Sequence, residues 1–145
     1  MDTPDTWSIR LGGAADAPAV LALWRKSETP TSPTDTEPAL RLLLDHDPDS
    51  LFLAVVGEEI IGSLIVAWDG WRGSFYRLAV HPNWRRRGIA TALVRAGEER
   101  LKGLGAVRLT AIVASDEQGA IALWEAAGYR RQADRSRFVR MVGED

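Results

Sequence analysis

The chain has 145 residues and no cysteine, and this absence removes several kinds of chemistry at once. Disulfides, thiolate metal sites and a cysteine nucleophile are all excluded. The two histidines, His46 and His81, are too few for a convincing metal cluster, so no metal is expected. No apolar run is long enough to span a membrane, and the polar N-terminus does not resemble a signal peptide. These features predict a cytoplasmic protein without a membrane partner.

A strong excess of charge of one sign is also missing. The formal net charge is −2, and charged residues make up 26% of the chain. The overall field therefore gives no reason to expect nucleic acid or an anionic membrane as a partner. Hydrophobic residues make up 46%, which is ordinary for a soluble globular protein. From the length we predict a single domain over residues 1–145.

One stretch, residues 75–91, organises the rest of the chain. It begins as a strand, because the residues from Phe75 to Val80 are mostly β-favouring, and Pro82 ends that strand. Three arginines and Gly88 follow, after which the apolar spacing becomes that of a helix. A helix N-terminus offers unpaired N–H groups and a positive dipole end, and a glycine lets a phosphate approach them. The pattern predicts binding of a di- or polyphosphate; the alternative is a plain turn beside a solvated arginine face.

The periodicity of apolar residues predicts the other elements. Strands are expected over Trp7–Leu11, Leu51–Val56, Ile60–Trp68 and Val107–Val113, and in a last hairpin of Tyr129–Arg131 with Arg135–Val142. Helices are expected after Asp16, which could cap the first of them, around Leu40–Leu44, after Gly88 with a face that includes Leu104, and over Ser115–Ala127. This order indicates an α/β protein, a mixed sheet with helices packed on it.

The acyl-coenzyme A binding motif of the GNAT (Gcn5-related N-acetyltransferase) family resembles residues 78–91, which read Leu-Ala-Val-His-Pro-Asn-Trp-Arg-Arg-Arg-Gly-Ile-Ala-Thr. The family motif is Arg/Gln-x-x-Gly-x-Gly/Ala after a strand that ends in Val-x-Pro, and Arg85, Gly88 and Ala90 fill its defined positions. A second family element, Ala-x-x-Leu-Tyr-x-x-x-Gly-Phe, resembles residues 120–129. The resemblance implies the GNAT fold, a central mixed, mostly antiparallel twisted sheet of about 6–7 strands flanked by about four helices.

The resemblance implies an acyl-CoA-dependent N-acyltransferase. It would transfer acetyl from acetyl-CoA to a primary amine of a small molecule, peptide or protein by direct attack in a ternary complex, and a homodimer is possible. In the family, amides of the turn hold the pyrophosphate and the central strand pairs with the pantetheine arm. Carried over by position, the CoA-binding residues are Leu78, Ala79, Val80, Arg85, Arg86, Arg87, Gly88, Ile89, Ala90 and Thr91. The alternatives are a catalytically weak acyl-CoA-binding module with a regulatory role, and a nucleic-acid patch at the arginines, against which the acidic total argues.

The chain departs from the family pattern where many relatives have their acid and base. Tyr76 stands where a central-strand glutamate is usual, Trp124 replaces the tyrosine that serves as thiolate acid, and Glu117 replaces an asparagine. An indole N–H donates a hydrogen bond but no proton at neutral pH. Because a protonated amine cannot attack a thioester, a general base is needed. The candidate catalytic residues are Tyr76, Glu117 and Asp69, whereas His81 is interpreted as a turn residue rather than a base.

The loop Asp69–Gly73 is the predicted acceptor site, because it leads directly into the central strand. Its Asp69 could attract an ammonium group, Arg72 could hold a carboxylate, and Trp71 could form an aromatic wall. With Glu28, these residues form the predicted substrate-binding set, which suits an amino-acid-like acceptor. The alternative is a plain turn in which Asp69 caps backbone amides.

Overall fold

The computed structural model describes residues 6–27, 30–114 and 117–143. They fall into two compact units, one up to Ala114 and one from Ser115 onward. Glu28 and the predicted helix start at Ser115 lie outside the described residues. The elements in chain order are β1 (Ser8–Leu11), the 3₁₀ turn η1 (Ala14–Asp16), α1 (Ala17–Lys26), α2 (Glu37–His46), β2 (Leu51–Val56), β3 (Glu59–Trp68), β4 (Gly73–Val80), η2 (Pro82–Trp84), α3 (Ile89–Leu104), β5 (Leu109–Ala111) and α4 (Gln118–Ala126).

The first unit contains a five-stranded sheet in the order β1-β2-β3-β4-β5. The pairs from β1 to β4 are antiparallel, and β4 pairs with β5 in parallel. A mixed, mostly antiparallel sheet is thus confirmed, with fewer strands than predicted. The strand predicted over Val107–Val113 is shorter, because only Leu109–Ala111 pair with β4, and Val107 is 97% exposed.

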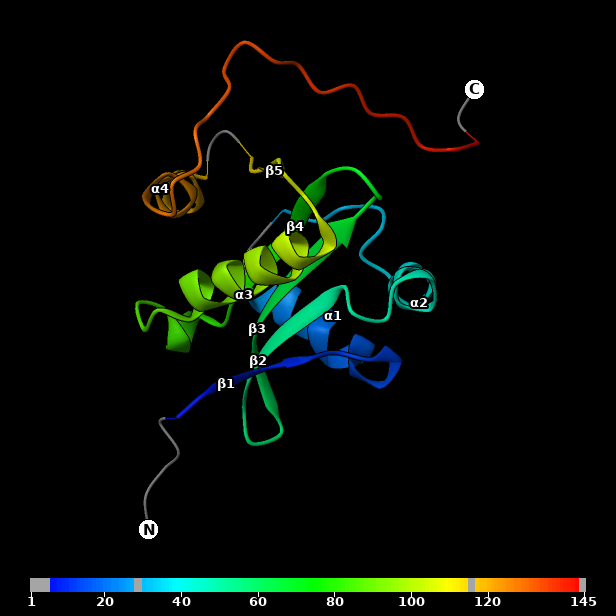
Figure 1. The fold of residues 1–145 in the computed structure, drawn as a ribbon. Coiled ribbons are helices and arrows are strands. Elements are labelled where there is room, and N and C mark those ends of the chain that lie inside the picture. The colour runs from blue at the N-terminus through cyan, green and yellow to red at the C-terminus, as the bar shows by residue number, and fades with distance from the viewer. Residues whose placement is uncertain (1–5, 28–29, 115–116, 144–145) are drawn as a thin grey trace. The chain divides into compact units, whose positions relative to one another are not determined.

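The hairpin predicted at the C-terminal end is wrong. Residues 129–143 form no strand in the described part of the second unit, where they follow α4 as an exposed, irregular segment (Figure 1). The prediction used the β-favouring side chains between Arg135 and Val142. Such side chains favour a strand only where a partner strand supplies the ladder, and an isolated hairpin is marginal in water.

Helices cover both faces of the sheet in the first unit (Figure 1). On one face, α1 and α2 pack buried side chains such as Leu23 and Leu40 against Leu53 and Ile65 of the sheet. The opposite face is covered by α3, whose buried residues are Ile89, Leu93, Val94, Gly97 and Leu101. The apolar face predicted for α3 included Leu104, but Leu104 is exposed. The buried face of the helix ends at Leu101.

Local capping explains where several helices begin and end. Thr36 accepts a hydrogen bond from the Ala39 amide at 3.2 Å at the start of α2. Gly105 has a φ of 102° and closes α3 in the left-handed conformation that glycine adopts at low cost. Asp16 precedes α1 as predicted but does not cap it, because its carboxylate accepts from the Gly13 amide at 2.8 Å instead. Among the described residues, no helix has the length and apolar character needed to cross a membrane.

Candidate functional site at the central strand

The central strand β4 carries a β-bulge. Arg77 and Leu78 together lie opposite the single β3 residue Leu64, where the register between the two strands shifts. Arg77 has a φ of 55°, in the left-handed region that residues with a side chain rarely adopt. An extra residue bends its strand and redirects the side chains beyond it.

The bulge brings two neighbouring side chains of β4 to one face. Tyr76 pairs with Ile65, which belongs to the core under α1 and α2, and paired residues project to the same face. The guanidinium of Arg77 lies on this face too, 4.7 Å from the ring centroid of Trp24 in α1. Tyr76 is 41% exposed, and it lies on the face where the Arg77 guanidinium contacts the Pro30 carbonyl.

The opposite edge of β4 is open beyond Phe75. The parallel ladder joins Gly73–Phe75 to Leu109–Ala111 and stops there, whereas β4 continues to Val80. The two strands therefore part from one another within the described sheet. A free strand edge presents N–H and C=O groups that an extended ligand can pair with.

The ladder on the β3 side shows which groups of Val80 face this open edge. The His81 amide donates to the Ile61 carbonyl at 2.8 Å. Antiparallel residues alternate between hydrogen-bonded and non-hydrogen-bonded pairs, so the next pair, Gly62 with Val80, is non-hydrogen-bonded. The N–H and C=O of Val80 consequently point away from β3 and toward the open edge.

The turn before α3 presents bare backbone at Gly88. This glycine has a φ of 80°, and a Cβ placed on it would meet no heavy atom within 4 Å. Ala92 makes the first intrahelical bond of α3, its amide donating to the Gly88 carbonyl at 3.0 Å. The amides of Ile89–Thr91 precede that bond and lie in the positive end of the helix dipole. The turn is thus shaped to receive an anion.

The basic residues of this turn take different partners. Arg85 donates to the Ser27 carbonyl at 3.0 Å and so ties the turn to the end of α1. The guanidinium of Arg87 lies 4.6 Å from the ring centroid of Trp84. His81 accepts a hydrogen bond on Nδ1 from the Asn83 amide at 3.1 Å and so caps the 3₁₀ turn η2; that it is not the base stays a prediction.

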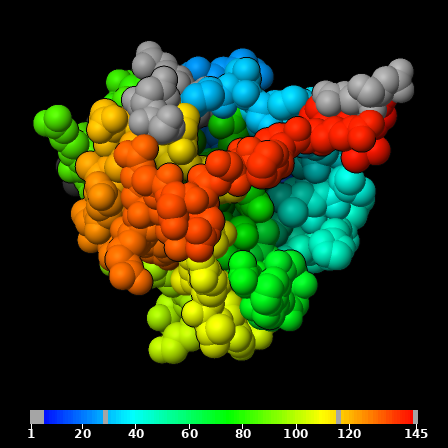
Figure 2. Space-filling model, turned by 90° about the horizontal axis from the view of Figure 1, so that it is seen from above, coloured from blue at the N-terminus to red at the C-terminus, as the bar shows by residue number. Residues whose placement is uncertain are grey.

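The loop Asp69–Gly73 lies at the start of β4. Figure 2 shows this β3–β4 turn, in green, at the surface next to the yellow segment that leads into β5. Asp69 Oδ1 accepts from the amides of Trp71 at 2.8 Å and Arg72 at 2.6 Å. The Arg72 amide is the largest cause that lowers the pKa of the Asp69 carboxyl from its usual value, which makes that carboxylate a weaker base. The guanidinium of Arg72 stacks 4.0 Å from the Trp71 ring centroid.

The second unit contains two of the residues singled out from the sequence. Glu117 precedes α4, and its carbonyl accepts from the Ile121 amide at 3.0 Å. Trp124 is buried in α4, its ring centroid 5.0 Å from that of Tyr129 in an edge-on contact. The structure describes this unit by itself, so a catalytic role for Glu117 stays a prediction. In residues 6–27, 30–114 and 117–143, no three His, Asp or Glu side chains gather as a metal site would require.

The open strand edge and the glycine turn at the start of α3 lie in the stretch whose sequence resembles the acyl-coenzyme A binding motif. A model of the acetyltransferase (GNAT) family matches residues 17–129. The chain belongs to the GNAT family. An acetyltransferase of Pectobacterium atrosepticum is 37% identical over 121 residues, which cover 83% of this chain and 86% of the relative. The predictions of the family and of an acetyltransferase are confirmed.

Solved structures share the fold of this GNAT acetyltransferase. Ard1 from Thermoplasma volcanium matches 88% of this chain and 84% of its own with a TM-score of 0.79 at 20% identity. The PaiA N-acetyltransferase from Thermoplasma acidophilum, solved in complex with coenzyme A, matches 88% of this chain and 91% of its own with a TM-score of 0.76 at 14% identity. At such identities the likeness concerns the fold alone.

Acetyl-CoA is the acyl donor that this family uses. Two features of the described residues fit parts of this molecule. The open space at Gly88, which any side chain would narrow, admits a phosphate to the amides of Ile89–Thr91. The open edge at Val80 offers a donor and an acceptor to an extended amide-containing arm. Both places belong to the first unit and to consecutive parts of the chain.

Arg77 is not among the site residues predicted from the sequence, although the alternation of side chains in this strand contains a signal for it. Strict alternation would put Arg77 on one face with Phe75 and Ala79, both of which are buried. A charged residue between two core residues signals that the alternation is broken there, and the bulge is the observed break. The partners of Arg77 come from distant parts of the chain and leave no such local signal.

Proposed function

We propose that this GNAT acetyltransferase transfers the acetyl group of acetyl-CoA to a primary amine of a small molecule or peptide, by direct attack in a ternary complex. The observation that carries the proposal is the open edge of β4 beside the glycine turn at the N-terminus of α3. Main-chain groups of Leu78–Val80 would pair with the pantetheine arm, and the amides of Ile89–Thr91 would take the pyrophosphate. The coenzyme A complex of PaiA supports the same ligand class for this chain.

The chemistry requires a neutral amine next to the thioester. Its nitrogen forms a bond to the carbonyl carbon, the carbon–sulfur bond breaks, and the proton lost by the amine is balanced by one gained by the departing thiolate. An α-amine titrates near ~8 and a lysine amine near ~10.4, so a base or relay water must remove a proton. A backbone N–H of β4 that points to the open edge near the bulge would bind the developing oxyanion, whereas the Val80 groups, farther along that edge, would pair with the arm.

We assign the acceptor to the face of β4 that carries Tyr76. Its exposed phenol stands one residue before the bulge, where it could orient the amine or its relay water. The stacked pair of Trp71 and Arg72 lies in the turn before the same strand, whose first residue, Gly73, is roughly 10 Å from Tyr76 at 3.3 Å per residue. This pair would contact the distal part of a longer acceptor. Asp69 stabilises that turn by accepting hydrogen bonds from two backbone amides, and we do not assign it as the base.

Acetyl-CoA consumption with a panel of amines tests the proposal. Purified protein is mixed with acetyl-CoA and with L-lysine, spermidine or a trialanine peptide, and thiol release and the acetylated product are followed together. We expect stoichiometric product from at least one amine, with saturation by acetyl-CoA. Tight acetyl-CoA binding without acetylation would favour the alternative of an acyl-CoA-binding module, which the Tyr76 and Trp124 positions keep open. Absence of acetyl-CoA binding would refute both.

A further inference from the structure

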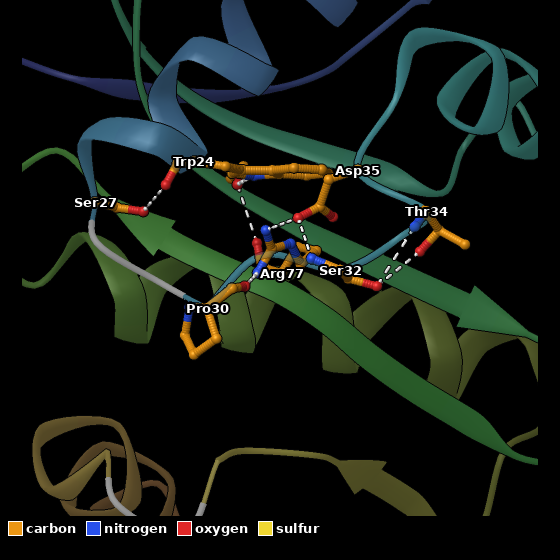
Figure 3. Close-up of polar contacts among 8 residues, drawn as sticks. Trp24, Ser27, Pro30, Ser32, Thr34, Asp35 and Arg77 are labelled. Atoms are coloured by element: carbon orange, nitrogen blue, oxygen red, sulfur yellow. Dashed lines mark hydrogen bonds and ion pairs between the residues drawn. The ribbon is translucent and has the colours of Figure 1, made fainter. Parts of the chain in front are cut away.

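Arg77 holds the segment between α1 and α2 on the bulge of β4. One nitrogen, Nη1, donates to the Pro30 carbonyl at 2.9 Å, and Nη2 forms an ion pair with the carboxylate of Asp35. Both charged side chains are largely buried, at 17% and 13% exposure. The flat face of the guanidinium lies on Trp24, so one arginine contacts the last turns of α1 and two points of the following segment (Figure 3).

The backbone of Arg77 is held by the same network. The indole N–H of Trp24 donates to Ser63 Oγ at 2.8 Å, and that hydroxyl donates to the Arg77 carbonyl at 3.0 Å. Asp35 in turn accepts from the Ser32 amide at 2.9 Å, which folds the segment back on itself (Figure 3). Strand, helix and segment therefore share one set of hydrogen bonds, centred on a residue in a rare backbone conformation.

We propose that Arg77 is a positioning residue for the acceptor site. Through Pro30 and Asp35 it fixes residues 30–36, and these residues form a wall of the acceptor site. The affinity for the amine therefore depends on the pair of Arg77 and Asp35, whereas the affinity for acetyl-CoA does not. The inference rests on the proposed function, because it assumes acetyl transfer at β4.

The order of groups along β4 indicates the side from which the acceptor approaches. A pantetheine arm paired with Leu78–Val80 would end near the bulge, so the thioester would lie there. The acceptor has to reach that point from a face of the strand. The face toward α3 is closed by buried packing, whereas the other face carries the exposed Tyr76 and the segment held by Arg77. Loosening residues 30–36 changes what the acceptor contacts, whereas the turn at Gly88 is held through Arg85 by Ser27 at the end of α1.

The chain supplies a matched control in the pair of Arg100 and Asp47. Arg100 of α3 donates to the Asp47 carboxylate at 2.7 Å and to the Val66 carbonyl at 2.8 Å. The two side chains are 17% and 18% exposed, close to the values for Arg77 and Asp35. This pair also joins an arginine of the scaffold to an aspartate of a connecting segment. Arg100 lies on α3, away from the face that carries Tyr76, and Asp47 lies at the C-terminal end of α2.

The test compares Asp35→Asn with Asp47→Asn. Each change removes one carboxylate charge and leaves a largely buried guanidinium without its ion-pair partner, so both variants lose stability. Three quantities are measured on both: KM for the best amine of the panel, Kd for acetyl-CoA by calorimetry, and deuterium uptake of residues 30–36. We expect Asp35→Asn to raise the acceptor KM about fivefold or more and to speed uptake in this segment, with the acetyl-CoA Kd within about twofold of wild type. Asp47→Asn should change neither the KM nor the uptake.

Arg77→Lys adds a graded measurement, because lysine keeps the charge but cannot make the same two-pronged contact. Its acceptor KM should fall between wild type and Asp35→Asn. Equal acceptor KM in Asp35→Asn and Asp47→Asn, or unchanged uptake in residues 30–36, would overturn the positioning role alone, because wild-type turnover would stand. Wild-type protein that acetylates no amine of the panel would overturn both this inference and the proposed function.

Discussion

Gly97 marks a place where α3 packs closely on the sheet. A Cβ on Gly97 would lie 2.8 Å from Cε1 of Phe75 and 2.9 Å from Cγ2 of Val66, both fully buried. Carbon atoms pack at about 3.5–4.0 Å, so the helix or the strands must move by about half an ångström or more. We expect this overpacking in Gly97→Ala to cost about 1–3 kcal/mol. Replacing glycine within a helix returns about 1 kcal/mol, so the net loss is smaller.

Gly103→Ala is the control, because Gly103 belongs to the same helix and a Cβ on it would meet no heavy atom within 4 Å. It should gain up to about 1 kcal/mol from helix propensity alone. The difference between the two alanine variants therefore isolates the packing cost of about 1–3 kcal/mol, or about 2–4 °C in Tm for each kcal/mol. Urea unfolding with equal m-values measures it. Gly97→Ala as stable as Gly103→Ala would refute the close contact between α3 and β4.

Three further predictions concern single side chains. Asp69→Asn should lower Tm and leave the acceptor KM unchanged, since Asp69 serves its own turn; a raised KM at normal Tm would instead support contact with the acceptor. Trp124→Phe should keep most of kcat, because an indole supplies no proton, and a selective loss of kcat at normal Tm and acetyl-CoA affinity would contradict this. The hydrogen bond from Arg10 lowers the pKa of Asp16 below its unfolded value of about 3.9, so the pair's contribution to stability is present above that pH and is lost as pH falls through the folded pKa. Urea unfolding at neutral pH and near pH 3 should show a smaller acid loss in Asp16→Asn, and an equal loss would argue against it.

The parts of the site with local causes could be predicted from the sequence. Pro82 ends the central strand and Gly88 begins the next helix, and the structure places β4 and α3 on either side of them. The left-handed φ of 80° at Gly88 is a property that glycine alone adopts at low cost. The position and backbone conformation of this turn could therefore be predicted without knowledge of the fold.

The parts that depend on distant partners could not be predicted. The bulge at Arg77 arises from the pairing register of β3 with β4. The Arg77 side chain contacts Asp35 and Trp24, which belong to other parts of the chain. The extent of β5 depends likewise on its pairing with β4, which limits it to Leu109–Ala111. The side chains of a segment indicate whether it favours a strand, but a strand forms only where a neighbouring strand pairs with it.

The opening at Gly88 can be tested with two valine variants at opposite ends of α3. Gly88 and Gly105 both have a positive φ, and a Cβ on either would meet no heavy atom within 4 Å, so Val strains the backbone in each. Only the side chain at Gly88 would stand in the path of a phosphate.

Isothermal titration of acetyl-CoA into wild type, Gly88→Val and Gly105→Val tests whether acetyl-CoA binds at the Gly88 turn. We expect Gly88→Val to bind at least about tenfold more weakly, a loss of about 1.4 kcal/mol, and Gly105→Val to bind as wild type does. Unchanged affinity in Gly88→Val, or equal losses in both variants, would contradict acetyl-CoA binding at this turn.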